Sequence, residues 1–222
     1  MIRALLDVGS REAESYRSLR TTLGLSRLTE GHRAVLFTSA RRGEGKSTTA
    51  ANFAVVCAAM ERPTLIIDAD LRNPRLETVF EPDDSPGLSV YLRTGRPERL
   101  EDLAVPTDLP CLDLVPAGVT AANAAELLAR PAFGELVAEA RERYEWVILD
   151  APPVLPVADA VIVSRVVDGV VLVVDIRRTP LSAARSARDL LRAVDAPVLG
   201  VLANNASAKT RSYGYGYGRY PA

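Results

Sequence analysis

The segment from Ser39 to Thr48 combines glycines, a lysine and hydroxyl residues in an order that could hold a triphosphate. It ends in Gly-Glu-Gly-Lys-Ser-Thr, and Ala40 stands where a Walker A motif usually has its first glycine. An apolar run, 34–37, precedes it and an alanine-rich stretch, 49–60, follows it. A P-loop needs this order of strand, glycine-bearing loop and helix, because backbone N–H groups and the positive helix end then face the phosphates. The segment therefore predicts a site for a nucleoside triphosphate.

Each residue type in this loop predicts a separate contact. The Lys46 ammonium would reach the β- and γ-phosphates, and the Ser47 hydroxyl would take a ligand position on a magnesium ion. The residues expected to line the nucleotide are Gly43, Glu44, Gly45, Lys46, Ser47 and Thr48.

A second apolar run, 65–67, is followed by two acids and a base at alternate positions, Asp68, Asp70 and Arg72. Side chains of an extended backbone alternate between faces, so these three would share one side if the chain stays extended. Neighbouring carboxylates repel each other unless a cation joins them, and a metal ion with phosphates would do so.

A third apolar run, 147–149, ends in Asp150, which is the arrangement of a Walker B motif. Such an acid holds magnesium directly or through water. Ligands of open parallel sheets bind outside the carboxyl ends of the strands, a rule that would gather Asp150, Asp68, Asp70 and Lys46 in one crevice. The alternative is that each aspartate simply forms a turn or caps a helix after its strand.

Apolar periodicity and helix signals predict alternating strands and helices along the chain. The expected helices span 12–28, 46–60, 88–93, 123–130, 132–143, 157–163 and 181–194. The expected strands span 34–39, 64–68, 112–115, 146–149, 170–174 and 198–203, with a proline-rich connector at 73–86. This alternation predicts an α/β fold of the P-loop NTPase type, with a mostly parallel sheet and helices on both faces. We expect one domain over 1–205 and a flexible glycine/tyrosine tail over 206–222.

Composition excludes several classes of protein. The 27 basic and 28 acidic residues nearly balance, so nothing argues for a nucleic-acid partner. No apolar run approaches the roughly 18 residues of a membrane span, and no signal peptide is expected. His32 is the single histidine, which excludes a histidine-based metal centre. Cys57 and Cys111 have apolar neighbours and are expected to be small core residues of a reduced, cytoplasmic protein.

Together these motifs resemble those of the bacterial tyrosine kinases of capsule and exopolysaccharide synthesis (BY-kinases). That family carries Walker A, Walker A′ and Walker B motifs, which stand here at 40–47, 66–72 and 147–150. Its N-terminal helix carries Glu-x-x-Arg-x-x-Arg, present here as Glu14, Arg17 and Arg20. It ends in a tyrosine cluster, matched by Tyr213, Tyr215, Tyr217 and Tyr220.

The resemblance implies an ATP- and Mg²⁺-dependent autokinase that phosphorylates its C-terminal tyrosines in trans. Lys46, Asp68, Asp70 and Arg72 would then be the catalytic residues, with Asp68 as the base. Ser47, Asp68, Asp70 and Asp150 would be the metal-binding candidates. In related P-loop ATPases, an asparagine placed like Asn204 bonds to the adenine, although a turn-forming asparagine explains this position nearly as well.

The resemblance also implies partners. The Glu14, Arg17 and Arg20 motif would join copies of the chain into a ring, whereas a plain reading is ion pairing along a solvated helix face. A membrane-embedded polysaccharide co-polymerase would activate the kinase and recruit it from the cytoplasm to the inner face of the membrane. A protein-tyrosine phosphatase would reset the tail. The chain is then either a stand-alone kinase or a piece of a larger fused protein.

Two other functions stay open at this point. A nucleotide-driven switch of the ParA/MinD type shares the expected fold, but carries a second lysine where this chain has Arg41. That reading also leaves the tyrosine tail and the Walker A′ pattern unexplained. The other alternative is an ATP-binding regulatory subunit without kinase activity.

Overall fold

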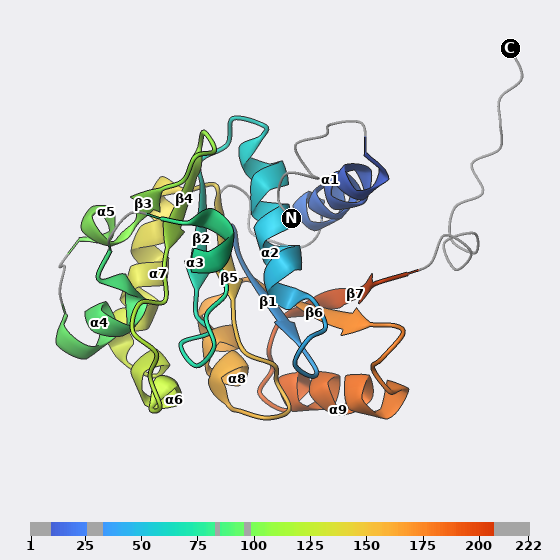
Figure 1. The fold of residues 1–222 in the computed structure, drawn as a ribbon. Coiled ribbons are helices and arrows are strands. Elements are labelled where there is room, and N and C mark those ends of the chain that lie inside the picture. The colour runs from blue at the N-terminus through green and yellow to red at the C-terminus, as the bar shows by residue number, and fades with distance from the viewer. Residues whose placement is uncertain (1–9, 26–32, 83–84, 96–98, 207–222) are drawn as a thin grey trace, which may run out of the picture.

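The computed structural model describes residues 10–25, 33–82, 85–95 and 99–206 (Figure 1). The strands in these ranges are β1 (Arg33–Ser39), β2 (Thr64–Asp68), β3 (Val105–Pro106), β4 (Leu112–Val115), β5 (Trp146–Asp150), β6 (Gly169–Asp175) and β7 (Val198–Asn204). The helices are α1 (Arg11–Gly24), α2 (Lys46–Ala58), α3 (Glu77–Phe80), α4 (Gly87–Thr94), α5 (Leu100–Leu103), α6 (Ala124–Leu128), α7 (Pro131–Arg143), α8 (Asp159–Val163) and α9 (Leu181–Arg192). A short 3₁₀ turn, Ser164–Val166, follows α8.

The strands in the described ranges form one seven-stranded sheet in the order β3-β4-β2-β5-β1-β6-β7. Every pairing in this described sheet is parallel except that of β3 with β4. β5 lies between β1 and β2, and its register sets Asp150 opposite Asp68 on one side and Phe37 on the other. The carboxyl ends of these three strands therefore meet at one edge of the sheet.

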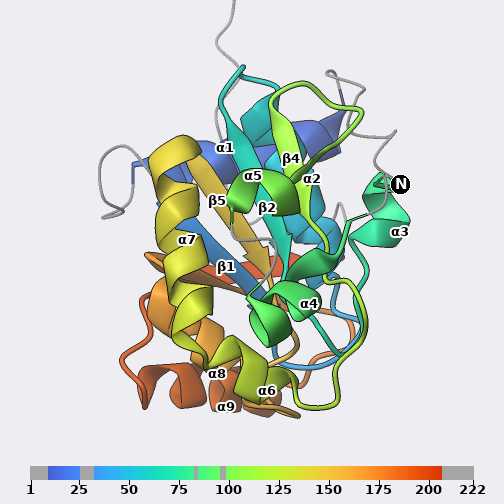
Figure 2. The ribbon, with the colours of Figure 1, turned by 90° about the vertical axis from the view of Figure 1, so that its left-hand side faces the viewer.

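Helices cover both faces of the sheet, as the α/β prediction requires. Alternate residues of β1 divide between two cores, with Leu36 in one and Phe37 in the other. α1, α2 and α3 supply the second core, while α4 to α9 supply the first. Figure 2 shows α4, α6 and α7 in front of the strands, with α1 behind them. The predicted fold class is confirmed.

An aromatic group closes the core at the amino end of the sheet. Trp146 begins β5 and is only 3% exposed. Its ring meets that of Phe53 edge-on, with 5.3 Å between the centroids, and Phe53 lies 5.3 Å from Phe37. The Arg33 guanidinium lies 5.0 Å from the Trp146 centroid, within reach of a cation–π contact.

The expected helices and strands are present, with ends shifted by a few residues. The structure adds α3 inside the expected connector, and α5 and β3 were not expected at all, because four residues or fewer leave no periodicity to detect. α1 runs to Gly24, and residues 26–28 of its expected range lie outside the described residues. No helix in the described segments is long and apolar enough to cross a membrane.

The expectation for the two cysteines was half right. Cys57 is fully buried in α2, and burial raises the pKa of its thiol well above the usual range. Cys111 is exposed, so its placement in the core was wrong. It has a φ of 63° just before β4, which is a turn conformation rather than a strand interior.

Candidate active site

The loop between β1 and α2 has the backbone of a phosphate cradle. Gly43 and Gly45 have φ values of 80° and 90°, in the left-handed region that glycine tolerates. Gly45 is the N-cap of α2, and no side chain of the described residues caps that end. The first N–H groups of α2 are therefore available to an anion, and the helix dipole favours negative charge there.

The Lys46 ammonium lies among the acids that the sequence singled out. Its Nζ lies 2.8 Å from Asp70 Oδ2, 3.3 Å from Asp150 Oδ1 and 3.1 Å from Ser47 Oγ. Burial alone would lower the pKa of this lysine, but the carboxylates of Asp150 and Asp70 outweigh that effect and raise it. Lys46 is therefore held as a cation at the carboxyl ends of the strands, as predicted.

Asp68 and Asp150 lie side by side beneath this lysine, and both are fully buried. Burial raises the pKa of Asp68 to about 7, and the charge of Asp150 adds to the shift. N–H bonds from Leu76 (2.9 Å) and Arg75 (3.0 Å) to the Asp68 carboxylate offset part of it. Burial also raises the pKa of Asp150, against the stabilising effects of Lys46 and Ser47.

The donor set fits a hard divalent cation. Within the described residues, the Asp70 and Asp150 carboxylates share the single ammonium of Lys46, and the buried carboxyl group of Asp68 lies opposite Asp150, so acidic groups outnumber the cation. Carboxylate and hydroxyl oxygens are the ligands that Mg²⁺ prefers. Among the described residues, no three acidic, histidine or cysteine side chains are grouped so that they could hold a metal ion by themselves. The fit therefore rests on charge and on the chemistry of the donors.

A cavity of about 1100 Å³ opens over this loop. The predicted nucleotide and metal residues that line it are Gly43, Gly45, Lys46, Ser47, Thr48 and Asp70. Arg42, Asn73, Arg75 and Pro153 add further lining. Asp68 and Asp150 are not among its lining residues. Of the three predicted acids, Asp70 therefore lines the cavity directly, Asp150 is linked to it through Lys46, and Asp68 lies opposite Asp150 in the sheet.

Glu44 and Asn204, both predicted to bind the nucleotide, hold the P-loop through hydrogen bonds within the protein. The Glu44 carboxylate is buried, accepts a 2.9 Å bond from the Arg41 N–H and bonds to the Thr179 hydroxyl. Asn204 Nδ2 donates a 2.9 Å bond to the Glu44 carbonyl oxygen. Both the Glu44 side chain and its carbonyl oxygen are thus bonded within the protein. Thr179 carries no motif in the sequence by which it could have been recognised.

Arg72 departs from the other Walker A′ residues. The chain leaves β2 after Asp68 and turns at residues 71–72, so the alternation of an extended strand does not continue. Arg72 Nε and Nη2 instead donate to the two carboxylate oxygens of Asp159, at 2.8 and 3.2 Å. The condition on which Arg72 was expected to share a side with both aspartates, an extended backbone, is therefore not met. Asp159 was missed, because an acid at a helix start is an ordinary N-terminal signal.

Comparison with known proteins decides the family. A family model described as ParA, NUBPL iron-transfer P-loop NTPase, matches residues 31–215. The tyrosine-protein kinase YwqD of Bacillus subtilis is 38% identical over 214 residues, which cover 96% of this chain and 89% of YwqD. The chain belongs to the bacterial tyrosine kinase family. The kinase domain of Escherichia coli tyrosine kinase ETK is 28% identical with a TM-score of 0.85, over 98% of this chain and 85% of that one.

Membership of the bacterial tyrosine kinase family confirms the enzyme class predicted from the motifs, and the P-loop NTPase fold is a nucleotide-binding fold. Relatives differ in length. In the putative tyrosine-protein kinase EpsB of Ralstonia solanacearum, the match is 37% identical and covers 93% of this chain but 28% of EpsB. The roles of individual residues stay predictions.

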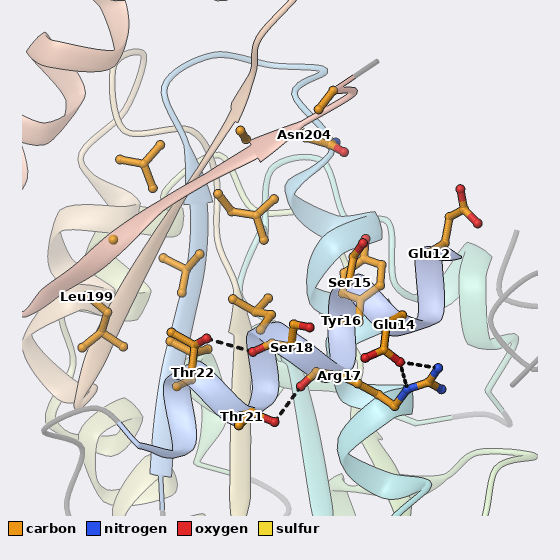
Figure 3. A pocket seen from close by; sticks show the side chains of 18 of the residues that line it. Glu12, Glu14, Ser15, Tyr16, Arg17, Ser18, Thr21, Thr22, Leu199 and Asn204 are labelled. Carbon is orange, nitrogen blue, oxygen red and sulfur yellow. Dashed lines mark hydrogen bonds and ion pairs between the residues drawn. The ribbon is translucent and has the colours of Figure 1, made fainter. Parts of the chain in front are cut away.

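The motif on α1 lies beside a second cavity, of about 1100 Å³, between α1 and β7 (Figure 3). Arg17 pairs with Glu14 at 2.8 Å on the exposed surface. Arg20 does not join this pair, because its Nη1 donates a 3.0 Å bond to the Val56 carbonyl oxygen on α2. The three motif residues therefore divide between the surface and the α1–α2 contact. The four predicted acceptor tyrosines lie outside the described residues.

Proposed function

We propose that this tyrosine kinase transfers the γ-phosphoryl group of ATP to the C-terminal tyrosines of a neighbouring copy. The observation that carries the proposal is the contact of Lys46 with Asp70, Asp150 and Ser47 at the floor of the P-loop cavity. Phosphoryl transfer asks a protein mainly to position the reactants and to neutralise developing charge. This cluster contains the groups that do both.

Each residue of this cluster is assigned a separate role. Lys46 and the loop N–H groups hold the β- and γ-phosphates, and Ser47, Asp70 and Asp150 would hold magnesium. A bound magnesium ion supplies positive charge that stabilises the transferring phosphoryl group. The attacking tyrosine oxygen bonds to the γ-phosphorus as the bond to the β–γ bridging oxygen breaks, leaving ADP. The tyrosine proton passes to a carboxylate.

We assign Asp68 as the base that accepts this proton. A base works best with a pKa near the working pH, and burial raises the pKa of Asp68 to about 7. Its oxygens accept N–H bonds from Asp70, Arg75 and Leu76, so access by the acceptor requires a shift of the 69–76 loop when substrates bind. Asp70 lines the cavity and is the alternative candidate for the base.

The tail is favoured as acceptor over the tyrosines that the structure describes. Tyr16 accepts a 3.2 Å bond from Asn52, Tyr91 donates to the Ala132 carbonyl at 3.4 Å, and Tyr144 donates to Asp113 at 2.7 Å. Each of these tyrosines is also partly buried. From Asn205 to Tyr220 the chain can extend about 50 Å, which is enough to reach a neighbouring copy.

Further parts of the proposal concern assembly and biological role. Copies would form a ring through the α1 surface. Tail phosphorylation would add negative charge and loosen that ring. A membrane-embedded polysaccharide co-polymerase would recruit the kinase to the inner face of the membrane, and a protein-tyrosine phosphatase would reset it. The resemblance to kinases of capsule and exopolysaccharide synthesis supports this role in polymer export.

The test incubates the full chain with Mg-ATP, with and without a membrane-activator fragment, and maps phosphate by mass spectrometry. We expect phosphate on Tyr213, Tyr215, Tyr217 or Tyr220, and none after all four are changed to Phe. ATP hydrolysis without phosphotyrosine would instead identify a ParA/MinD-type switch. Nucleotide binding without either reaction would identify a regulatory subunit.

A second pair of variants tests the base. Asp68→Asn should lower the rate of phosphorylation by about 10²–10⁴-fold while sparing nucleotide binding. Asp70→Asn should weaken the magnesium dependence of nucleotide binding. Normal phosphorylation by Asp68→Asn together with a larger loss in Asp70→Asn would transfer the role to Asp70.

A further inference from the structure

The ion pair of Arg72 and Asp159 joins the Walker A′ motif to the start of α8, and its two residues lie 87 positions apart in the chain. Asp159 begins α8 and is fully buried. Both its oxygens accept bonds from Arg72, in the bidentate geometry that carboxylates and guanidinium groups favour. A third donor of Arg72, Nη1, bonds to the Ala122 carbonyl oxygen at 3.0 Å. Arg72 is thus fixed from two sides.

The Arg72 contact lies close to Asp70 along the chain. Asp70 precedes Arg72 by two residues in the irregular segment after β2. Its carboxylate also accepts a 3.0 Å bond from the Asn73 N–H, and the neighbouring Leu71 carbonyl accepts a 2.9 Å bond from the Ala121 N–H. Each of these bonds involves a residue within a few positions of Asp70, whose Oδ2 contacts Lys46.

The segment that leads to Asp159 is hydrogen-bonded to β1, the strand that precedes the P-loop. Between Asp150 and Asp159, the Ala151 N–H bonds to the Phe37 carbonyl at 3.2 Å, and the Val154 N–H bonds to the Ser39 carbonyl at 2.8 Å. Asp159 therefore follows a segment that is hydrogen-bonded to β1. This strand runs directly into the P-loop. The Arg72–Asp159 pair extends this support to the Walker A′ motif.

We propose that Asp159 is a positioning residue, which acts through Arg72 to hold Asp70 against Lys46 and so sets the acids for magnesium and phosphoryl transfer. The inference rests on the proposed function of the Lys46 site. A direct role of Arg72 on the substrate would not depend on Asp159, which is buried and bonds to Arg72. Under the positioning role, loss of either partner should have the same effect. The positioning role also differs from a purely stabilising ion pair, which would leave the chemistry unchanged.

The experiment uses the full chain carrying Asp159→Asn, Arg72→Gln, Arg72→Lys or the Asp159→Asn/Arg72→Gln double change. Melting temperature is measured first, followed by calorimetric binding of ATP over a magnesium titration and by the kcat and KM of autophosphorylation. Arg141→Gln is the matched control. Arg141 also bridges a carboxylate, Asp168 at 3.0 Å, and a carbonyl, Val166 at 3.0 Å, but at the amino ends of the strands.

We expect Asp159→Asn to lower kcat by about 10–100-fold with less than about a threefold change in KM for ATP, because small misplacements of reacting groups act mainly on the chemical step. The magnesium concentration for half-maximal enhancement of ATP binding should rise several-fold. The kcat of the double variant should be no lower than that of either single variant. Arg72→Lys should retain a higher kcat than Arg72→Gln. Arg141→Gln should lower the melting temperature alone.

Three results would overturn the inference: unchanged kcat and magnesium dependence in Asp159→Asn, additive losses in the double variant, or equal effects of Arg141→Gln on the chemistry. If Asp159→Asn does not fold, Arg72→Lys and Arg72→Gln decide the question on the same measurements. If the wild-type chain binds Mg-ATP but labels no tyrosine, the proposed function fails. The magnesium titration then still decides the role of Asp159.

Discussion

The side-chain amide of Asn204 donates a 2.9 Å hydrogen bond to the carbonyl oxygen of Glu44, which lies 160 residues earlier in the chain. The last strand is therefore attached directly to the P-loop. The contact is close enough that a Cβ on Gly45 would lie 2.1 Å from Asn204 Nδ2. Glycine at position 45 is favoured by its φ of 90°, and a side chain there would also displace the Asn204 amide from its bond to Glu44.

Comparing two alanine substitutions separates these reasons. Gly43 has a similar φ of 80° but nothing within 4 Å of an added Cβ. We expect Gly43→Ala to lower the free energy of unfolding by about 1 kcal/mol through backbone strain alone. Gly45→Ala should lower it by about 3 kcal/mol, since overpacking is added. Urea denaturation followed by circular dichroism measures both, and equal losses would contradict the Asn204 contact.

Replacing Lys46 by Met removes the only cation within hydrogen-bonding distance of Asp70 and Asp150 among the described residues. We expect at least a ~100-fold loss of Mg-ATP affinity and about 3 kcal/mol of stability at pH 8, because breaking a buried ion pair leaves uncompensated charge. The stability loss should shrink at pH 5, because burial raises the pKa of Asp150 and its uncompensated carboxylate then protonates more readily. Calorimetry and denaturation at both pH values measure this, with the exposed Arg93→Met as control.

The raised pKa of Asp68 predicts a pH dependence of stability in the protein without nucleotide and magnesium. The folded pKa of about 7 exceeds the ordinary aspartate value of 3.8, so the folded state binds more protons between these values. Stability should therefore fall as the pH rises from about 4 to about 7. The slope should be smaller in Asp68→Asn. Thermal unfolding across this range measures it, and parallel curves for the two proteins would exclude the shift.

The divided positions of Arg17 and Arg20 allow a sharper test of the ring. Arg20→Ala removes a contact to α2 within one copy, so it should lower the stability of α1 docking as well as any assembly. Arg17→Ala should dissociate the ring while leaving the melting temperature within a degree or two, because exposed ion pairs contribute little. Light scattering measures the mass. An unchanged assembly in Arg17→Ala would remove that residue from the interface.

The sequence was sufficient for the fold because its strong signals are local. The β-branched and apolar runs before Ser39, Asp68 and Asp150 can only be buried strands, and the helices between them make the sheet parallel. The P-loop was predictable for the same reason, since its residues are contiguous. Short elements such as α5 depend on tertiary packing and give no periodic signal.

The site was predictable only where a motif marked it. The gathering of Lys46, Asp70 and Asp150 followed from the rule on strand ends. The partners Asp159 and Thr179 depend on contacts between distant segments, which no spacing in the sequence encodes. Arg72 shows the limit most clearly, because one turn after Asp68 redirected a side chain that strand alternation had placed beside the acids.

The position of Trp146 has a practical consequence. It is the single tryptophan of the sequence and begins the strand that ends at Asp150, about 13 Å away along four residues. Its emission therefore reports the packing of the aromatic group at the far end of the sheet and is remote from bound nucleotide. One intrinsic optical probe can thus distinguish a variant that has lost its core from one that has lost only its chemistry.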